Sequence, residues 1–269
     1  MATISNSNSP FVEIKPFPVR RNLVVDAGYL ANKRHIIHGL VEVDVTEARE
    51  EIKKQKVSFT AYLVACVGRA VAQDASVAAY RNWRGQLVIF HNDVDIVTMI
   101  EPSENAVAIP HIIRHAERRS VTEISDEIRS VQSKPRRSAQ ENRGLNVAAR
   151  FPRWVRMLAF SWFRQNPHRF KRVQGTVILT SVGMFGKSGG YGVGFLPCHT
   201  LGLTIGGIAK KPGIAPDGRI EPRDFLNLTV SFDHDIVDGA PAARFTSRLV
   251  DLIGSASLVL EKEKGEKTE

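Results

Sequence analysis

The sequence lacks several features that would assign a protein to a particular class. Its only two cysteines, Cys66 and Cys198, stand in apolar stretches, so we expect reduced, buried thiols rather than a disulfide. No run of about 18 uncharged apolar residues and no basic-then-apolar leader is present, which favours a cytoplasmic protein without a membrane span. His, Cys and acidic residues do not occur together at metal-ligand spacings, so we expect no metal.

Positive charge is abundant but concentrated in one segment. The net charge is +9, yet residues 134–172 alone hold eleven Lys and Arg against one acid, Glu141, and so contribute +10. The remainder is nearly neutral. Because the excess is confined to this basic insert, it does not predict a protein that binds nucleic acid.

An amphipathic helix is expected inside the insert, over residues 151–164. Trp154, Leu158 and Trp162 recur there at four-residue steps, with arginines at the edges of the stripe. Three interpretations stay open: a helix docked on its own domain or on a neighbouring subunit, a helix in peripheral contact with a membrane, or a site for an anion.

Strand and helix patterns alternate along the rest of the chain. Alternating or continuous apolar runs predict strands at residues 40–45, 87–90, 94–100, 106–109, 175–181, 200–208 and 225–232. Three- and four-residue periodicity predicts helices at residues 46–55, 59–71, 120–128 and 240–260. We therefore expect one α/β domain over residues 22–260, a mixed β-sheet with flanking helices, between a flexible tail at 1–21 and a charged tail at 261–269.

The stretch most suggestive of chemistry joins the last predicted strand to the last predicted helix. It contains His234-x-x-x-Asp238-Gly239, and functional side chains often gather where a strand gives way to a loop. Taken alone, this spacing is more typical of a histidine in an ordinary turn.

Two segments together resemble a known family. Asp233 to Gly239 is similar to the signature of dihydrolipoamide acyltransferases, which chloramphenicol acetyltransferase shares in shorter form. Gly175 to Gly186 resembles the Gly-Thr-Phe-Thr-Ile-Ser-Asn-Leu-Gly block of the same family, and it places Ser181 53 residues before His234. The resemblance covers about residues 22–260 and implies a chloramphenicol acetyltransferase-like fold.

The resemblance also implies an activity: transfer of an acyl group between a thioester, either acyl-CoA or acyl-dihydrolipoamide, and an acceptor. His234 would be the general base, Ser181 the hydroxyl that stabilises the oxyanion, and Asp238 a residue that holds the local shape. The glycine after Asp238 would adopt a backbone angle forbidden to other residues. The positions expected to contact substrate or coenzyme A are Gly183, Gly239, Thr180 and His38.

The same resemblance implies partners. The family builds each active site between two subunits, so we expect a homotrimer, which may assemble further into a cage, with His234 and Ser181 supplied by different chains. The 21 residues before the domain are too few for a lipoyl domain, so a lipoyl group would have to arrive in trans, or free acyl-CoA would serve.

Several positions depart from the family pattern. Asp235 stands where arginine is usual and Val182 where asparagine is common, which leaves open a catalytically inactive oligomeric scaffold that binds a partner or a membrane through its basic helix. The glycine-rich stretch 186–194 lacks the ending of a phosphate-binding loop and is expected to form a wall of the substrate channel. Asp93 and Asp95 are expected to form turns or ion pairs.

Overall fold

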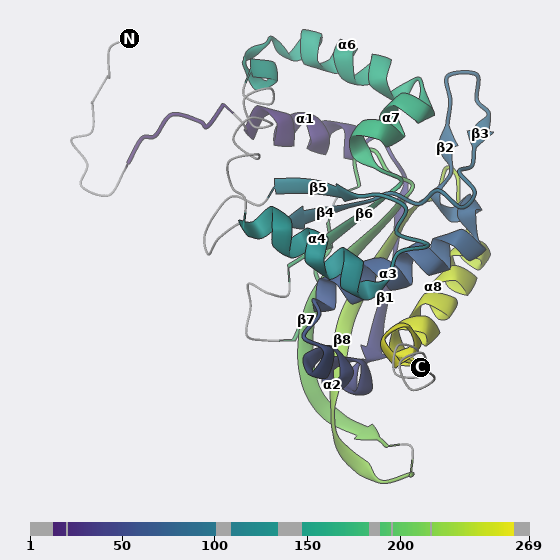
Figure 1. Ribbon diagram of the computed structural model, residues 1–269. Coiled ribbons are helices and arrows are strands. Elements are labelled where there is room, and N and C mark those ends of the chain that lie inside the picture. Colours follow the sequence, from purple (N-terminus) through teal and green to yellow (C-terminus); the bar gives the residue numbers. More distant parts are fainter. Residues whose placement is uncertain are drawn as a thin grey trace.

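The protein is one mixed sheet with helices packed against it, as a computed structural model shows (Figure 1). The structure describes residues 13–19, 21–100, 109–133, 147–182, 189–194, 196–215 and 217–260. Six strands follow the order β1-β8-β7-β6-β4-β5, and β2 and β3 form a separate hairpin. Pairing is parallel for β4 with β6 and for β6 with β7, and antiparallel for β1 with β8, β8 with β7 and β4 with β5.

The strands of the main sheet are β1 (Ile36–Asp44), β4 (Ile96–Ile100), β5 (Ile109–Ile113), β6 (Val177–Ser181), β7 (Leu201–Ile214) and β8 (Ile220–Asp233). The small hairpin consists of β2 (Tyr80–Arg81) and β3 (Leu87–Val88). The α-helices are α1 (Arg21–Ala31), α2 (Thr46–Gln55), α3 (Phe59–Gln73), α4 (Val121–Ser133), α6 (Arg153–Arg164), α7 (Pro167–Gln174) and α8 (Gly239–Gly254).

Helix α3 lies at the centre of the core. Ser58 caps it as its sequence predicts, with the hydroxyl accepting a hydrogen bond from the Ala61 amide at 3.4 Å. The helix approaches the turn after β5 so closely that a Cβ on Gly68 would lie 2.6 Å from the Ala116 carbonyl carbon. Helix α3 thus packs against one face of the sheet, and the ends of the strands stay available for functional side chains.

Most of the predicted elements are confirmed, with two kinds of difference. Helix α2 spans the predicted residues 46–55, but β7 and β8 run several residues beyond their predicted ends. Pro212 of β7 pairs with Pro222 of β8 in a two-stranded arm that projects from the sheet (Figure 1). Helices α1 and α7 were not predicted, and α1 begins at Arg21, inside the segment expected to be a tail. The strand predicted at residues 106–109 shares only Ile109 with β5, and residues 106–108 lie outside the described part of the chain.

Several predictions fall on parts of the chain outside the described residues. They include the tails at 1–12 and 261–269, the start of the basic insert at 134–146, and Gly183. No helix within the described part of the chain has the length and apolar character needed to cross a membrane.

Candidate active site

His234 occupies the turn that follows β8. Its backbone amide donates a 2.7 Å hydrogen bond to the His35 carbonyl, so the residue before β1 braces the turn after β8. The imidazole is half-exposed, with Nδ1 3.9 Å from Oδ1 of Asp238, too far for a hydrogen bond. Asp238 precedes α8 and leaves 86% of its side chain exposed. The sequence therefore places His234 at a free strand end, where another molecule can reach it.

A buried ion pair fixes the strand end immediately before His234. Arg34 Nε donates to Oδ2 of Asp233 at 2.8 Å, and Arg34 Nη2 bonds the same oxygen. The two side chains are 10% and 3% exposed. Sequence reasoning missed Arg34, although an aspartate at the end of an apolar strand is itself a signal that a counter-charge is needed.

Asp235, the residue that departs from the family pattern, has a partner in its own chain. Its Oδ1 lies 2.7 Å from Nδ1 of His35. The hydrogen bond and the negative charge of Asp235 raise the pKa of His35. The charge reversal at this position is therefore matched by an imidazole, and it leaves the turn around His234 intact.

His38 and Gly239 line one cavity of about 600 Å³ between β1 and α8. His38 Nδ1 lies 2.8 Å from the Ser231 hydroxyl, so both residues face each other across the β1–β8 pair. The expectation that Gly239 adopts a forbidden backbone angle is wrong: its φ is not positive, and no atom lies within 4 Å of where a Cβ would stand. Gly239 instead leaves space at the cavity wall, because a side chain there would point into open volume.

Ser181 lies elsewhere, at the end of β6. Thr180 and Ser181 pair with Thr204 and Ile205 of β7, and both are partly buried. The described part of the glycine-rich segment packs on this end: a Cβ on Gly192 would come within 2.4 Å of the Val182 side chain. This contact places the segment beside Ser181, the position in which a channel wall was expected.

The strand register separates His234 from Ser181 within one chain. Ser181 is level with Ile205, which pairs with Leu228 of β8, and His234 follows six residues later. At about 3.4 Å per residue, the two side chains lie about 20 Å apart along the sheet. A single chain therefore does not bring the predicted base and the predicted hydroxyl together.

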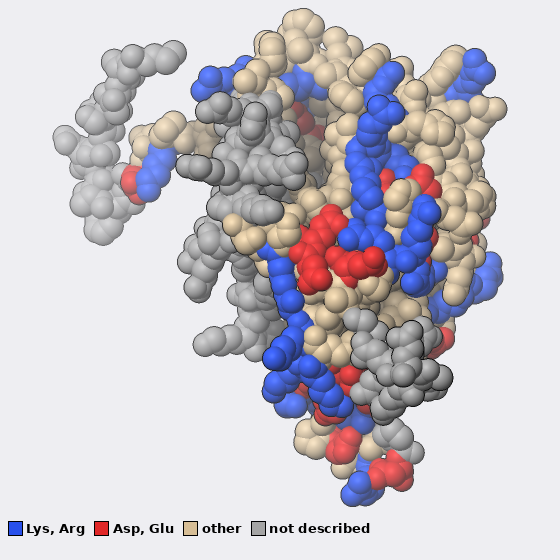
Figure 2. Space-filling model, viewed as in Figure 1, with Lys and Arg blue, Asp and Glu red and all other residues tan. Residues whose placement is uncertain are grey.

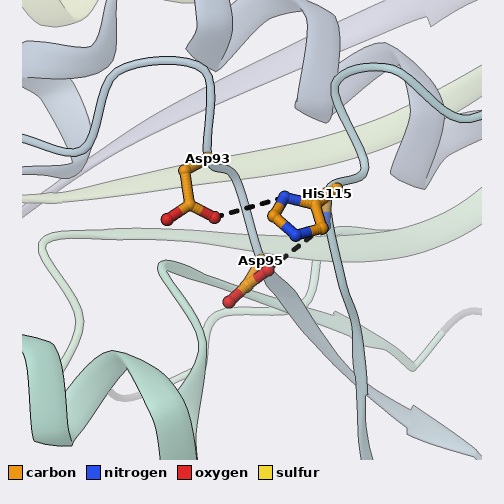
Figure 3. Close-up of side chains that lie close together, drawn as sticks. All are labelled: Asp93, Asp95 and His115. Carbon is orange, nitrogen blue, oxygen red and sulfur yellow. Dashed lines mark hydrogen bonds and ion pairs between the residues drawn. The ribbon is translucent and has the colours of Figure 1, made fainter.

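A third cluster comprises Asp93, Asp95 and His115, whose possible ligand atoms lie within 4.8 Å of one another (Figure 3). The protein's own cations occupy it. Lys171 Nζ donates to Asp93 and Asp95 at 2.7 Å each, and Arg114 donates to Asp95 at 2.6 Å. Burial favours a raised pKa for Asp95, but these hydrogen bonds hold it below its usual value. The cluster is an ion-pair network, as expected for Asp93 and Asp95.

The two thiols are free, as predicted. Burial raises the pKa of Cys66 and of Cys198 to about 12, which makes both poor nucleophiles. Next to Cys198, burial lowers the pKa of His199 to about 4, so this imidazole is neutral near pH 7. Neither group has the properties of a reactive centre.

Comparison with protein families matches most of the chain to one model. Residues 33–145 and 163–261 match the 2-oxoacid dehydrogenases acyltransferase (catalytic domain) model. The unmatched residues 146–162 contain most of α6.

Curated relatives are more than twice as long as the region they share with this chain. The acetyltransferase component of the pyruvate dehydrogenase complex of Rickettsia bellii is 23% identical over 82% of this chain and 45% of its own length. The lipoamide acyltransferase component of the branched-chain alpha-keto acid dehydrogenase complex of Bacillus subtilis is also 23% identical, over 83% of this chain and 48% of its own. The chain thus spans about half the length of these relatives.

Solved structures confirm the fold. The Azotobacter vinelandii dihydrolipoamide acetyltransferase gives a TM-score of 0.66 at 17% identity, covering 97% of this chain and 100% of that one. The cubic core of the pyruvate dehydrogenase multienzyme complex gives 0.65 at 17% identity with the same coverage. Chloramphenicol acetyltransferase gives 0.56 at 13% identity, covering 90% of this chain and 98% of that one. The predicted chloramphenicol acetyltransferase-like fold is confirmed.

Proposed function

Since the chain belongs to the family of 2-oxoacid dehydrogenase acyltransferase catalytic domains, we propose that it transfers an acyl group between a thioester and a thiol acceptor, with His234 as the general base. The observation that supports this most directly is the position of His234 at an accessible strand end, inside a matched segment. The Azotobacter structure concerns a serine, a histidine 52 positions later and an asparagine four positions beyond, in the catalytic mechanism of that enzyme. Here Ser181, His234 and Asp238 stand 53 and four positions apart.

The chemistry requires a base and an oxyanion donor. His234 takes the proton of the acceptor thiol while the sulfur of that thiol attacks the thioester carbonyl. The resulting oxyanion accepts a hydrogen bond from Ser181, a stabilisation of about 3 kcal/mol. When the tetrahedral intermediate collapses, the departing thiolate recovers the proton from His234, so the base is regenerated.

The separation of about 20 Å along the sheet supports a site in which Ser181 comes from another copy of the chain. We therefore propose a homotrimer with an active site at each subunit interface, which can assemble further into a cage. The acyl group is proposed to pass between coenzyme A and the dihydrolipoamide of a lipoyl domain, or from acyl-CoA to a free thiol acceptor. The cavity lined by His38 and Gly239 is the proposed approach to His234.

Formation of S-acyl-dihydrolipoamide and free coenzyme A, separated by chromatography, from acetyl-CoA or longer acyl-CoAs and dihydrolipoamide tests the proposal. His234→Ala should slow transfer about 10²- to 10⁴-fold, the usual contribution of a positioned general base. His91→Ala, at an exposed histidine, is the matched control and should transfer at the parent rate.

Mixed oligomers test the shared site. If each site takes His234 from one chain and Ser181 from another, refolding equal amounts of His234→Ala and Ser181→Ala chains should restore about a quarter of the parent activity, because a quarter of the interfaces then carry both groups. If His234 and Ser181 acted within one chain, the mixed oligomers would show no restored activity.

The competing proposal is a catalytically inactive scaffold of the same fold. Asp235 and Val182 suggested it, but Asp235 is hydrogen-bonded to His35, and the Val182 amide donates to the Ile205 carbonyl at 2.9 Å in a regular sheet contact. Equal release of coenzyme A by the parent and by His234→Ala, across all acceptors, would favour the scaffold. Contact of residues 151–164 with a membrane is a separate proposal, because it does not depend on catalysis.

A further inference from the structure

All three tryptophans of the chain are exposed at the same end of the molecule. Trp154 and Trp162 lie on α6 and are 67% and 55% exposed, and Trp83 lies on the β2–β3 hairpin and is 69% exposed. Leu158, 62% exposed, completes the stripe on α6. A cavity of about 610 Å³ is lined by both α6 and the hairpin, so the two elements are neighbours. We call Trp83, Trp154, Leu158 and Trp162 the indole face.

Packing within the chain does not account for the indole face. Helix α6 has no fully buried residue, and it rests on its neighbours through the side that carries Val155, Arg156 and Phe160. Arg156 Nε donates to Asp26 of α1 at 2.6 Å, which holds α6 against α1. Trp154 lies beside Tyr29 and Lys33 of α1, yet 67% of it stays exposed. Most of α6 also falls in residues 146–162, outside the matched family segments, so contacts common to the family do not explain the stripe.

The segments around the indole face carry an excess of positive charge. Residues 21–35, 80–92 and 147–174 contain twelve Lys and Arg and a single acid, Asp26. Two of these cations pair with carboxylates from other segments, Arg34 with Asp233 and Lys171 with Asp93 and Asp95. Asp233 and Asp235 also line the cavity between α6 and the hairpin. Asp26 is buried and paired with Arg156 and Arg153. Figure 2 shows this end in tan and blue, while red gathers lower on the molecule.

Three exposed aromatic rings at this end, those of Trp83, Trp162 and Tyr29, have a cation beside them. Arg169 lies 3.5 Å from the ring centroid of Trp162, and Arg84 lies 4.8 Å from that of Trp83. Tyr29 of α1 is flanked by Lys33 and Arg153, each at 4.5 Å. An indole beside an arginine suits the boundary of a bilayer, because the ring lies at the headgroup level while the guanidinium binds phosphate.

From this combination we propose that the indole face docks on the surface of an anionic lipid bilayer. The exposed tryptophans and leucine provide the apolar contact, and the surrounding cations provide attraction to negative headgroups. An acidic protein would satisfy the charge, but it would not require a row of large apolar side chains in solvent. The helix lies on the bilayer and does not cross it.

Flotation with lipid vesicles tests the proposal on the full chain. Vesicles of phosphatidylcholine with about 30% phosphatidylglycerol should bind the protein at least tenfold better than phosphatidylcholine alone, and 0.5 M NaCl should weaken binding because it screens charge. The triple variant Trp154→Ser/Leu158→Ser/Trp162→Ser should lose at least tenfold in binding. The control Ile214→Ser/Ile220→Ser removes isoleucines that are 75% and 79% exposed at the distant β7–β8 tip, and it should bind like the parent.

Tryptophan fluorescence reports on the same surface, because the chain has no tryptophan outside it. Anionic vesicles should shift the emission to shorter wavelength, and lipids brominated in their acyl chains should quench it. Binding without a shift, equal binding by the triple variant, or a shift caused by polyglutamate and not by vesicles would each overturn the proposal. His234→Ala should float like the parent, so the outcome is independent of catalysis.

Discussion

Removing Arg34 should destabilise the end of β8 far more than removing an exposed arginine. Arg34→Ala would leave Asp233, 3% exposed, without its counter-charge, and it would delete both hydrogen bonds to Oδ2. Breaking a buried pair by removing one partner typically costs about 3–5 kcal/mol, because the remaining charge stays desolvated. Arg219→Ala breaks a pair whose side chains are 80% and 49% exposed, and it should cost about 0–1 kcal/mol.

Urea unfolding at matched protein concentrations measures both changes, since assembly contributes to apparent stability. The double variant Arg34→Met/Asp233→Asn removes both charges and should recover most of the lost free energy. An Arg34→Ala loss below about 1 kcal/mol, or a double variant no more stable than the single, would refute the argument that the uncompensated carboxylate is the cause.

Two further predictions concern buried groups. His199 has a pKa of about 4 in the folded protein against an ordinary 6.5, so it favours the folded state above pH 6.5. The free energy of unfolding should therefore fall by up to about 2–3 kcal/mol as pH drops toward 4. His199→Leu should flatten this pH dependence, and an unchanged slope would contradict the assignment. Gly175 has φ of 72°, and a Cβ there would lie 2.8 Å from the Asp95 carbonyl oxygen. Gly175→Ala should therefore lower the free energy of unfolding by at least about 2 kcal/mol. Gly28→Ala is the control, because no atom lies within 4 Å of a Cβ there, and it should be neutral or stabilising.

Local patterns were sufficient to predict much of the fold. The apolar side chains that recur every three or four residues over 59–71 predict α3, but the expected half-buried helix is wrong, because residues 61–68 are all buried. Helix α1 was missed because it buries only Asp26 and Ala31, so its sequence carries no clear apolar stripe. The projecting arm was missed because Pro212 and Pro222 resemble turn residues until their pairing is seen.

The site was predictable in its residues but not in its arrangement. His234 and Ser181 were identified from two short segments, whereas their separation along the sheet follows from a register that joins β6, β7 and β8. The pairing of Arg34 with Asp233 joins residues 199 positions apart, and that of His35 with Asp235 joins residues 200 apart. No local signal specifies such partners, because they meet only after β1 has been placed beside β8.

Ion pairs tie both sides of the α6–α7 unit to the rest of the molecule. Arg156 joins α6 to Asp26, and Lys171 joins α7 to Asp95 at the start of β4. The α6–α7 unit is therefore held on the rest of the molecule from both of its helices. The tip of the β7–β8 arm lies at the opposite end of the molecule from α6 (Figure 1). A bilayer in contact with α6 would therefore hold that tip at the greatest distance from its surface.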